Sequence, residues 1–130
     1  MNTRIYSLGG IVPVPVFTVP RLPGRLVGVC MGPFVVLAKD YANDWPTVVH
    51  ELEHCKQFWR GGLLIHFARY YFSRKYRLRA ELDAYRAELK ACTDGQRASR
   101  LDDSARALSS GYQLQLDTAT CRKLLQDPVV

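Results

Sequence analysis

The pattern of apolar and polar residues changes near residue 43, which divides the chain into two parts of different structure. Five prolines and five glycines lie within residues 9–33, a density typical of turns, extended segments and short strands. Two apolar segments, 25–31 and 34–39, are separated by Gly32-Pro33. This arrangement predicts a β-hairpin with its turn at the Gly-Pro pair.

Helical patterns follow, and the first predicted helix has signals at both ends. Asp44 is a favourable N-terminal cap, and Pro46 falls in the first turn, where its missing N–H costs nothing. Gly61-Gly62 ends the helix. The apolar residues recur at spacings of four, three and four, and they are Val48, Leu52, Cys55 and Trp59.

Three more helices are predicted. One helical region runs from Leu63 to about Ala91 with a break near Ser73, and two shorter helices follow Gly95. Their apolar stripes are Leu78, Leu82, Tyr85 and Leu89, then Leu101, Ala105 and Leu108, then Cys121, Leu124 and Leu125. The whole pattern predicts an α+β fold, with a small N-terminal β-hairpin or sheet on the first helix and extra helices at the C-terminal end.

The length of 130 residues is that of one domain, and 48% hydrophobic residues suffice for its core. This domain, 1–130, comprises a β-rich part (1–43), a helical part with the candidate site (44–92) and a C-terminal helical part (93–130). No apolar run approaches the roughly 20 residues that span a bilayer, and prolines interrupt the N-terminal region. We therefore expect a soluble, cytoplasmic protein. Its four cysteines form no CxxC pair, which favours free thiols.

The net charge of +6 is concentrated in one stretch of the chain. Residues 56–79 carry seven basic side chains and no acidic one, and half of the aromatic residues lie in or beside this stretch. Such a stretch can contact nucleic acid or an anionic membrane. Aromatic residues at helical spacing more often belong to the core, and basic runs more often form a solvated helix face. The pattern therefore favours a solvated face over either contact.

The first predicted helix contains an HExxH motif, His50-Glu51-Leu52-Glu53-His54. A spacing of four places both imidazoles on one helical face, about 5–6 Å apart at Cβ, from which they can share a zinc ion. Glu51 can then take a proton from a water that the metal activates. On a helical wheel the histidines lie roughly 150° from the apolar stripe, so they face away from the core and toward a cleft.

A catalytic zinc ion usually has a third protein ligand, and four residues are candidates for it. Glu81 lies about 75° from the centre of its helix's apolar stripe, whereas Asp83 lies roughly 125° away and should point to solvent. Glu88 flanks the stripe but lies farther from the expected helix crossing, which favours a solvated carboxylate. His66 is expected to pack among aromatic residues. Glu81 is therefore the preferred ligand.

These residues resemble those of the gluzincins, zinc metallopeptidases with an HExxH helix and a glutamate on a later helix. The motif at residues 50–54, followed by Glu81-Leu82-Asp83-Ala84-Tyr85, carries this resemblance. The stretch 50–57, the aromatic-basic helix after it and residues 81–86 resemble small phage and bacterial proteins described as minimal gluzincins, over about a third of the chain. The resemblance implies a zincin-like fold and one zinc ion per chain. It implies His50, His54 and Glu81 as zinc ligands and Glu51 as general base.

The resemblance also implies a substrate-binding edge strand that pairs with an extended peptide. Its residues would be Phe34, Val35, Val36 and Leu37. Larger gluzincins often have an aspartate, four residues after the glutamate ligand, that supports a histidine ligand. Here that position is Tyr85, so its hydroxyl takes the role or the role is unfilled. His66 and several tyrosines, Tyr85 among them, are candidates to stabilise the oxyanion.

Three hypotheses of function follow. The first is a zinc-dependent peptidase that acts on peptide or protein substrates through a metal-activated water. The second is a non-catalytic or latent zinc-stabilised binding module, because the chain is small and the C-terminal helices could cover the site. The third, a nucleic-acid or membrane-surface module built on the basic stretch, is disfavoured for the reasons given above.

Overall fold

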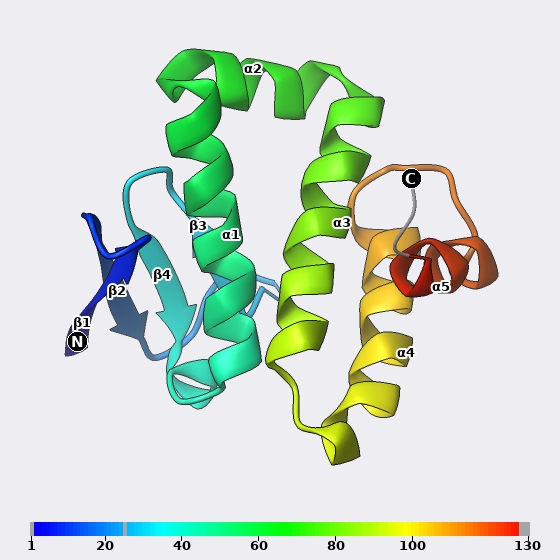
Figure 1. Cartoon of the computed structure of the whole chain (residues 1–130), viewed down its shortest axis with the longest axis horizontal. Helices are drawn as coiled ribbons and strands as arrows, with labels where there is room; N and C mark the ends of the chain where they lie inside the picture. The colour runs from blue at the N-terminus through cyan, green and yellow to red at the C-terminus, as the bar shows by residue number, and fades with distance from the viewer. Residues whose placement is uncertain (1, 25, 128–130) are drawn as a thin grey trace.

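The computed structural model describes residues 2–24 and 26–127 and has an α+β architecture (Figure 1). Its α-helices are α1 (Trp45–Gly61), α2 (Leu63–Phe72), α3 (Arg74–Ala91), α4 (Asp94–Gly111) and α5 (Thr118–Gln126), and a short 3-10 helix, Lys39–Tyr41, precedes α1. A four-stranded sheet forms the first layer, and α1, then α3, then α4 with α5 pack behind it (Figure 1). The short helix α2 lies across one end of α1 and α3.

The sheet consists of β1 (Asn2–Leu8), β2 (Val12–Val19), β3 (Gly28–Cys30) and β4 (Val35–Ala38), in the spatial order β1-β2-β4-β3. β3 pairs with β4 in antiparallel register, with Val29 opposite Val36. The predicted hairpin is thereby confirmed, although its strands are shorter than expected. Arg25, with which the first predicted segment begins, lies outside the described residues.

β4 lies inside the sheet and not at its edge. It pairs with β3 on one side and, in parallel, with β2 on the other. The prediction of an edge strand for substrate is therefore wrong for Phe34, Val35, Val36 and Leu37. The reason is that β2 occupies the side of β4 that a hairpin alone would leave open. The outer strand next to α1 is β3.

β1 and β2 form a second antiparallel hairpin that the sequence pattern does not distinguish from a loop. Pro13 and Pro15 lie within β2, and they weaken its strand signal because proline cannot donate to a ladder of hydrogen bonds. Both precede Val16, where pairing with β4 begins. This half of β2 therefore has a partner strand on one side only. Val14 and Val16 alternate with the prolines and enter the core.

The ends of the helices agree with the sequence signals. Asp44 immediately precedes α1 and Gly62 follows it. The predicted break near Ser73 separates α2 from α3, and the Ser73 hydroxyl accepts a hydrogen bond of 3.1 Å from the backbone N–H of Tyr76. Within the described residues, none of the helices combines the length and the apolar character that crossing a membrane requires.

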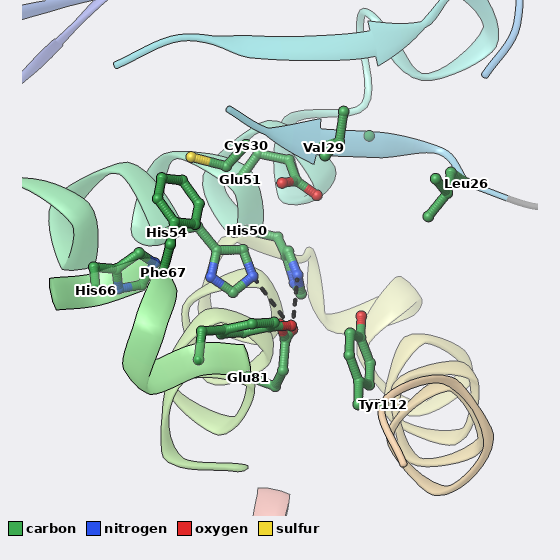
Figure 2. Close-up of a pocket in the computed structure, with 12 residues that line it drawn as sticks. Leu26, Val29, Cys30, His50, Glu51, His54, His66, Phe67, Glu81 and Tyr112 are labelled. Carbon is green, nitrogen blue, oxygen red and sulfur yellow. Dashed lines mark hydrogen bonds and ion pairs between the residues drawn. The ribbon is translucent and has the colours of Figure 1, made fainter. Parts of the chain in front are cut away.

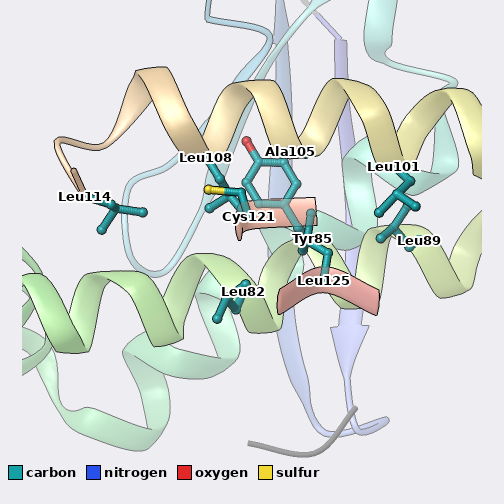
Figure 3. Packing of buried hydrophobic residues seen from close by; sticks show 9 residues of the cluster. All are labelled: Leu82, Tyr85, Leu89, Leu101, Ala105, Leu108, Leu114, Cys121 and Leu125. Carbon is teal, nitrogen blue, oxygen red and sulfur yellow. The ribbon is translucent and has the colours of Figure 1, made fainter. Parts of the chain in front are cut away.

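Two separate hydrophobic clusters form the core. One lies between the sheet and α1, and it consists of Val14, Val16, Val35, Leu37, Val48 and Cys55. The other lies among α3, α4 and α5 (Figure 3), and it consists of Leu82, Tyr85, Leu89, Leu101, Ala105, Leu108, Leu114, Cys121 and Leu125. Between the clusters, α1 faces α3 with several polar side chains. We call this polar α1–α3 interface the seam.

The buried face of α1 ends at Phe58 and not at Trp59, the residue predicted. Phe58 is 5% exposed, whereas Trp59 is 52% exposed. The reason lies in the turn between β3 and β4, which packs on the Phe58 ring. Gly32 in this turn has a φ of +99°, and a Cβ atom there would lie 2.9 Å from Cε1 of Phe58.

Replacing Gly32 with alanine is expected to lower the free energy of unfolding by about 1–3 kcal/mol. The added methyl group meets a buried ring, and the positive φ is unfavourable for alanine. Gly95→Ala is the matched control, because Gly95 lies in the first turn of α4 with no atom within 4 Å of the added Cβ. Urea unfolding of both variants tests this, and equal losses of stability would contradict it.

Candidate metal centre

Two histidines of α1 and one glutamate of α3 meet in the seam. His50 and His54 lie one helical turn apart, and Glu81 faces both of them (Figure 2). Oε1 of Glu81 lies 3.2 Å from Nε2 of His54 and 3.6 Å from Nε2 of His50. This buried His-His-Glu group could hold a metal ion.

The two distances from Oε1 of Glu81 fit a tetrahedral ion, and all three ligand atoms lie within 4.8 Å of one another. With metal–ligand bonds of about 2.1 Å, neighbouring ligand atoms lie about 3.4 Å apart, close to the two distances above. Oε1 of Glu81 is completely buried and accepts no hydrogen bond within the described part of the chain. A buried carboxylate oxygen without an aligned donor is costly, and either protons on the two imidazoles or a cation between the three atoms would neutralise it.

Both imidazoles have an acceptor at the nitrogen that faces away from the Glu81 carboxylate. Nδ1 of His50 lies 2.9 Å from Oε1 of Glu88, an ion-pair contact that lacks the geometry of a hydrogen bond. Nδ1 of His54 lies 3.0 Å from Oε1 of Gln57, whose amide nitrogen donates a 2.9 Å hydrogen bond to the backbone carbonyl of Ala80. An acceptor at Nδ1 holds the proton there and leaves the Nε2 lone pair for a metal.

Glu81 is held from behind in the same manner. The hydroxyl of Tyr70, on α2, donates a short hydrogen bond to Oε2 of Glu81. Burial, together with the nearby Glu81 charge, raises the pKa of Tyr70 well above its ordinary value, so the hydroxyl keeps its proton and remains a donor. Oε1 is thereby left to face the histidines. Each of the three ligands has an outer partner, and this is what a rotationally fixed ligand set requires.

Glu88 is buried, and the expectation of a solvated carboxylate is wrong. Its Oε2 lies 3.3 Å from Arg100 of α4, and Arg100 forms a two-pronged ion pair of 2.9 and 3.0 Å with Asp44. The chain of contacts from His50 through Glu88 and Arg100 to Asp44 therefore connects α1, α3 and α4. The sequence placed Glu88 too far from the helix crossing because α1 and α3 lie side by side over several turns (Figure 1).

Tyr85 does not hold a histidine through its hydroxyl. Its ring packs edge-on against His50, with ring centroids 4.3 Å apart, and its hydroxyl lies 2.8 Å from the hydroxyl of Tyr112. The position that resembles the supporting aspartate of larger gluzincins is thus filled by a packing contact. Glu88, one turn farther along α3, supports His50 instead.

The carboxylates of the seam control its protonation. Burial by itself would lower the pKa values of the two histidines, but Glu81 and Glu88 raise that of His50 to about 10, and Glu81 raises that of His54 to about 9. The pKa of Glu81 is lowered well below its ordinary value, because the two histidines outweigh its burial. Without a metal, the cluster is therefore an ion-paired group with two imidazolium ions.

Glu51 lies on the sheet side of the same cavity, next to β3 (Figure 2). The residue is 6% exposed, and burial raises the pKa of its carboxyl group although the two nearby histidines act to lower it. β3 passes closely over it at Gly28, where a Cβ atom would lie 2.7 Å from Cδ2 of Leu37 and 3.2 Å from Oε1 of Glu51. A larger residue at position 28 would therefore collide with the side chains beneath β3, Glu51 among them.

The cavity beside the triad has a volume of about 210 Å³. Of the other residues considered as a third ligand, His66 lines this cavity and Asp83 does not. Nδ1 of His66 lies 2.8 Å from the Tyr76 hydroxyl. Sequence reasoning missed Gln57, Gly28 and Tyr112 as parts of this site. Gln57 carried one usable signal, since it lies three residues after His54 on the same helix, whereas Tyr112 reaches the cavity only through the tertiary packing of α4.

Comparison of the chain with protein-family models, curated proteins and solved structures found no match. The fold and the site alone define the class of protein: an α+β protein with a buried His-His-Glu group that could hold a metal ion.

Metal binding at neutral pH is expected to release about two protons per ion, because both imidazoles are protonated without metal and must lose a proton to bind it. The affinity should accordingly rise between pH 6 and 8 by roughly two powers of ten per pH unit. Calorimetric titration with Zn²⁺ in two buffers of different ionisation enthalpy measures the released protons. Release of fewer than one proton would show that the imidazoles are neutral in the metal-free protein.

Glu88→Gln is expected to weaken the affinity for Zn²⁺ about 10–100-fold, because the amide keeps the shape of the side chain but removes the charge that supports His50. Glu53→Gln is the matched control, since Glu53 lies on α1 and pairs with Lys56 at 3.5 Å, outside the seam. Competition with a chelator measures both affinities, and circular dichroism checks the fold. Unchanged affinity in Glu88→Gln would remove Glu88 from the site.

Proposed function

We propose that the protein is a zinc-dependent peptidase of the gluzincin type, with His50, His54 and Glu81 as ligands and Glu51 as general base. The observation that carries this proposal is the set of outer partners, which direct all three ligand atoms to one point beside a buried carboxyl group. Two histidines and one glutamate are a donor set of catalytic zinc sites. When bound, the zinc ion would act as a Lewis acid on the scissile carbonyl and on water.

Glu51 is suited to move the proton that peptide hydrolysis requires. Its oxygen would accept a proton from the attacking water while the water oxygen bonds to the carbonyl carbon. The same proton then passes to the amine nitrogen as the peptide bond breaks. A raised pKa favours this exchange, because the group must hold the proton briefly before it passes the proton on. Gly28 keeps β3 from displacing the carboxyl group.

The substrate would lie along β3. A second hollow adjoins the metal cavity and shares Leu26, Gly28, His50, Glu51 and Tyr112 with it. This hollow has a volume of about 630 Å³ and continues between the segment before β3 and α4. β3 is an outer strand, so its free edge can form main-chain hydrogen bonds with an extended peptide. In this proposal β3 has the role that the resemblance to gluzincins implied for residues 34–37.

His66 and Tyr112 line the cavity on opposite sides of Glu81 (Figure 2), and we propose them as the donors for the oxyanion. Burial raises the pKa of Tyr112 well above its ordinary value, which keeps its proton in place. Burial lowers the pKa of His66. In this proposal the Tyr76 hydroxyl donates to Nδ1 of His66, 2.8 Å away, so that the neutral imidazole carries its proton on Nε2. Either group can donate to an oxygen that gains charge.

The second candidate function is a zinc-stabilised binding module without catalysis. The burial of the ligands favours it, because Glu81 is only 2% exposed and the cavity of about 210 Å³ is smaller than most ligand pockets. In this case the metal would join α1 to α3 across the seam, and the polar partners would serve stability alone. The two functions differ in whether Glu51 matters beyond metal binding.

Glu51→Gln is expected to retain one zinc ion per chain and to lower peptide cleavage about 100–10,000-fold, the usual contribution of a general base. Metal content by mass spectrometry and cleavage of a fluorogenic peptide library measure the two effects. Glu53→Gln, two residues away on the same helix, should cleave at the wild-type rate. His54→Ala and Glu81→Ala should lose the metal and the activity together.

Three outcomes would contradict the peptidase. If Glu51→Gln cleaves as fast as the wild-type protein, Glu51 is not the base. If wild-type protein holds zinc but cleaves no member of the library, the binding module is the better account. If wild-type protein takes up no zinc after reconstitution, both accounts fail, and the seam is an ion-paired structural cluster.

A further inference from the structure

α2 has an apolar outer face that nothing in the described part of the chain covers. Its inner side contributes His66, Phe67 and Tyr70 to the metal cavity. Large apolar residues occupy the outer side, and their exposed fractions are 90% for Phe72, 78% for Leu64, 78% for Tyr71 and 56% for Ile65. Such a cluster on one helix is unusual for a surface that meets only water. The expectation that the aromatic residues of this stretch belong to the core is therefore wrong for Tyr71 and Phe72.

The ends of α2 and the neighbouring turns are uniformly basic. Lys56 and Arg60 lie on the last turns of α1, Arg69 lies on α2, and Arg74 and Lys75 begin α3. All five are exposed, and residues 54–80 contain no aspartate or glutamate. The remaining 13 basic residues of the chain are nearly balanced by its 12 acidic ones, so most of the net charge of +6 belongs to this end of the molecule.

Three arginines from three helices surround one hollow at the same end. Arg60 of α1, Arg69 of α2 and Arg79 of α3 line it, with Gln57, Gly61, Tyr76, Ala80 and Asp83. None of these arginines forms an ion pair with a described residue, whereas several arginines elsewhere do. Unpaired guanidinium groups around a hollow are suited to a phosphate group, with Asp83 the only acid that lines it.

We propose that the outer face of α2, with the surrounding basic residues, binds the surface of an anionic phospholipid bilayer. Leu64, Ile65 and Phe72 would enter the boundary between headgroups and acyl chains, and the three arginines would meet lipid phosphates. A ten-residue helix with an apolar face and basic flanks lies in the plane of the interface. The basic side chains complement the negative charge of the lipid headgroups, and for this reason we infer an anionic bilayer as the partner of this face.

Two properties favour lipid over nucleic acid. Nucleic acid also binds basic surfaces, but its bases stack on aromatic rings and gain little from aliphatic side chains. Leu64 and Ile65 are aliphatic and lie on the same side of α2 as Tyr71 and Phe72. Lipid acyl chains accept all four side chains.

Membrane binding through α2 would also orient the metal site. The inner side of α2 forms part of the cavity wall, and a helix with its side chains is about 10–12 Å thick. The cavity would therefore lie within about one helix diameter of the lipid surface. This consequence concerns position only and holds whether or not the site is catalytic.

The test is co-sedimentation of the full chain with vesicles. We expect binding to vesicles of phosphatidylglycerol and phosphatidylcholine in equal parts, little binding to pure phosphatidylcholine, and weaker binding at high salt. Leu64→Ser with Phe72→Ser should weaken binding about 100-fold through lost apolar burial. Arg60→Gln, Arg69→Gln and Arg79→Gln together should weaken it roughly 100-fold, at about fivefold for each charge.

Matched controls separate this face from general properties of the chain. Ile11→Ser removes an apolar residue that is 85% exposed in the β1–β2 turn, and it should leave binding unchanged. Arg21→Gln, Lys90→Gln and Lys123→Gln together lower the net charge as much as the arginine triple, but at exposed positions outside the face. Circular dichroism and urea unfolding of every variant show whether the fold is intact.

Four outcomes would overturn the proposal. They are the absence of binding to anionic vesicles, equal binding to neutral ones, equal loss in the charge-matched control, and tighter binding to duplex DNA than to vesicles at the same salt concentration. Analytical ultracentrifugation adds a fifth test. A wild-type dimer that Leu64→Ser with Phe72→Ser separates would show that a second copy of the chain covers the face.

Discussion

Mutual neutralisation of charged side chains in the seam is the constraint on which the packing of α1 against α3 depends. His50, His54, Glu81 and Glu88 are largely removed from water, and an isolated buried charge would cost several kcal/mol. The sheet cluster lies on one side of the seam and the α3–α4–α5 cluster on the other. The two hydrophobic clusters are therefore joined through polar groups, and the candidate metal site is part of what holds the fold together.

The same neutralisation can be achieved in two ways. Protons on both imidazoles give an ion-paired cluster around Glu81, and a divalent cation between the three ligand atoms gives the same balance of charge. The outer partners serve both states, because Glu88, Gln57 and Tyr70 contact atoms that do not face the centre. The ligands can therefore exchange protons for a metal without a change of rotamer, which lowers the cost of binding.

Local signals in the sequence predicted local features, and tertiary packing decided the rest. The ends of α1, the break at Ser73 and the convergence of His50 and His54 depend on residues within one or two helical turns of each other. The position of Glu88 depends on the long side-by-side contact of two helices, and that of β4 depends on β2 entering the sheet from a proline-rich segment. Such long-range pairings leave no periodic signal in a single sequence.

The helix α2 shows how one short segment can meet two opposite demands. Its inner residues must be polar enough to support Glu81 and apolar enough to exclude water, which aromatic side chains with hydroxyl or imidazole groups achieve. Burial of this inner side does not require the outer side to be apolar, because a helix of this length could carry charged residues there at no cost to packing. Leu64, Ile65 and Phe72 are therefore not explained by the fold, and the proposed lipid surface would account for them by removing them from water.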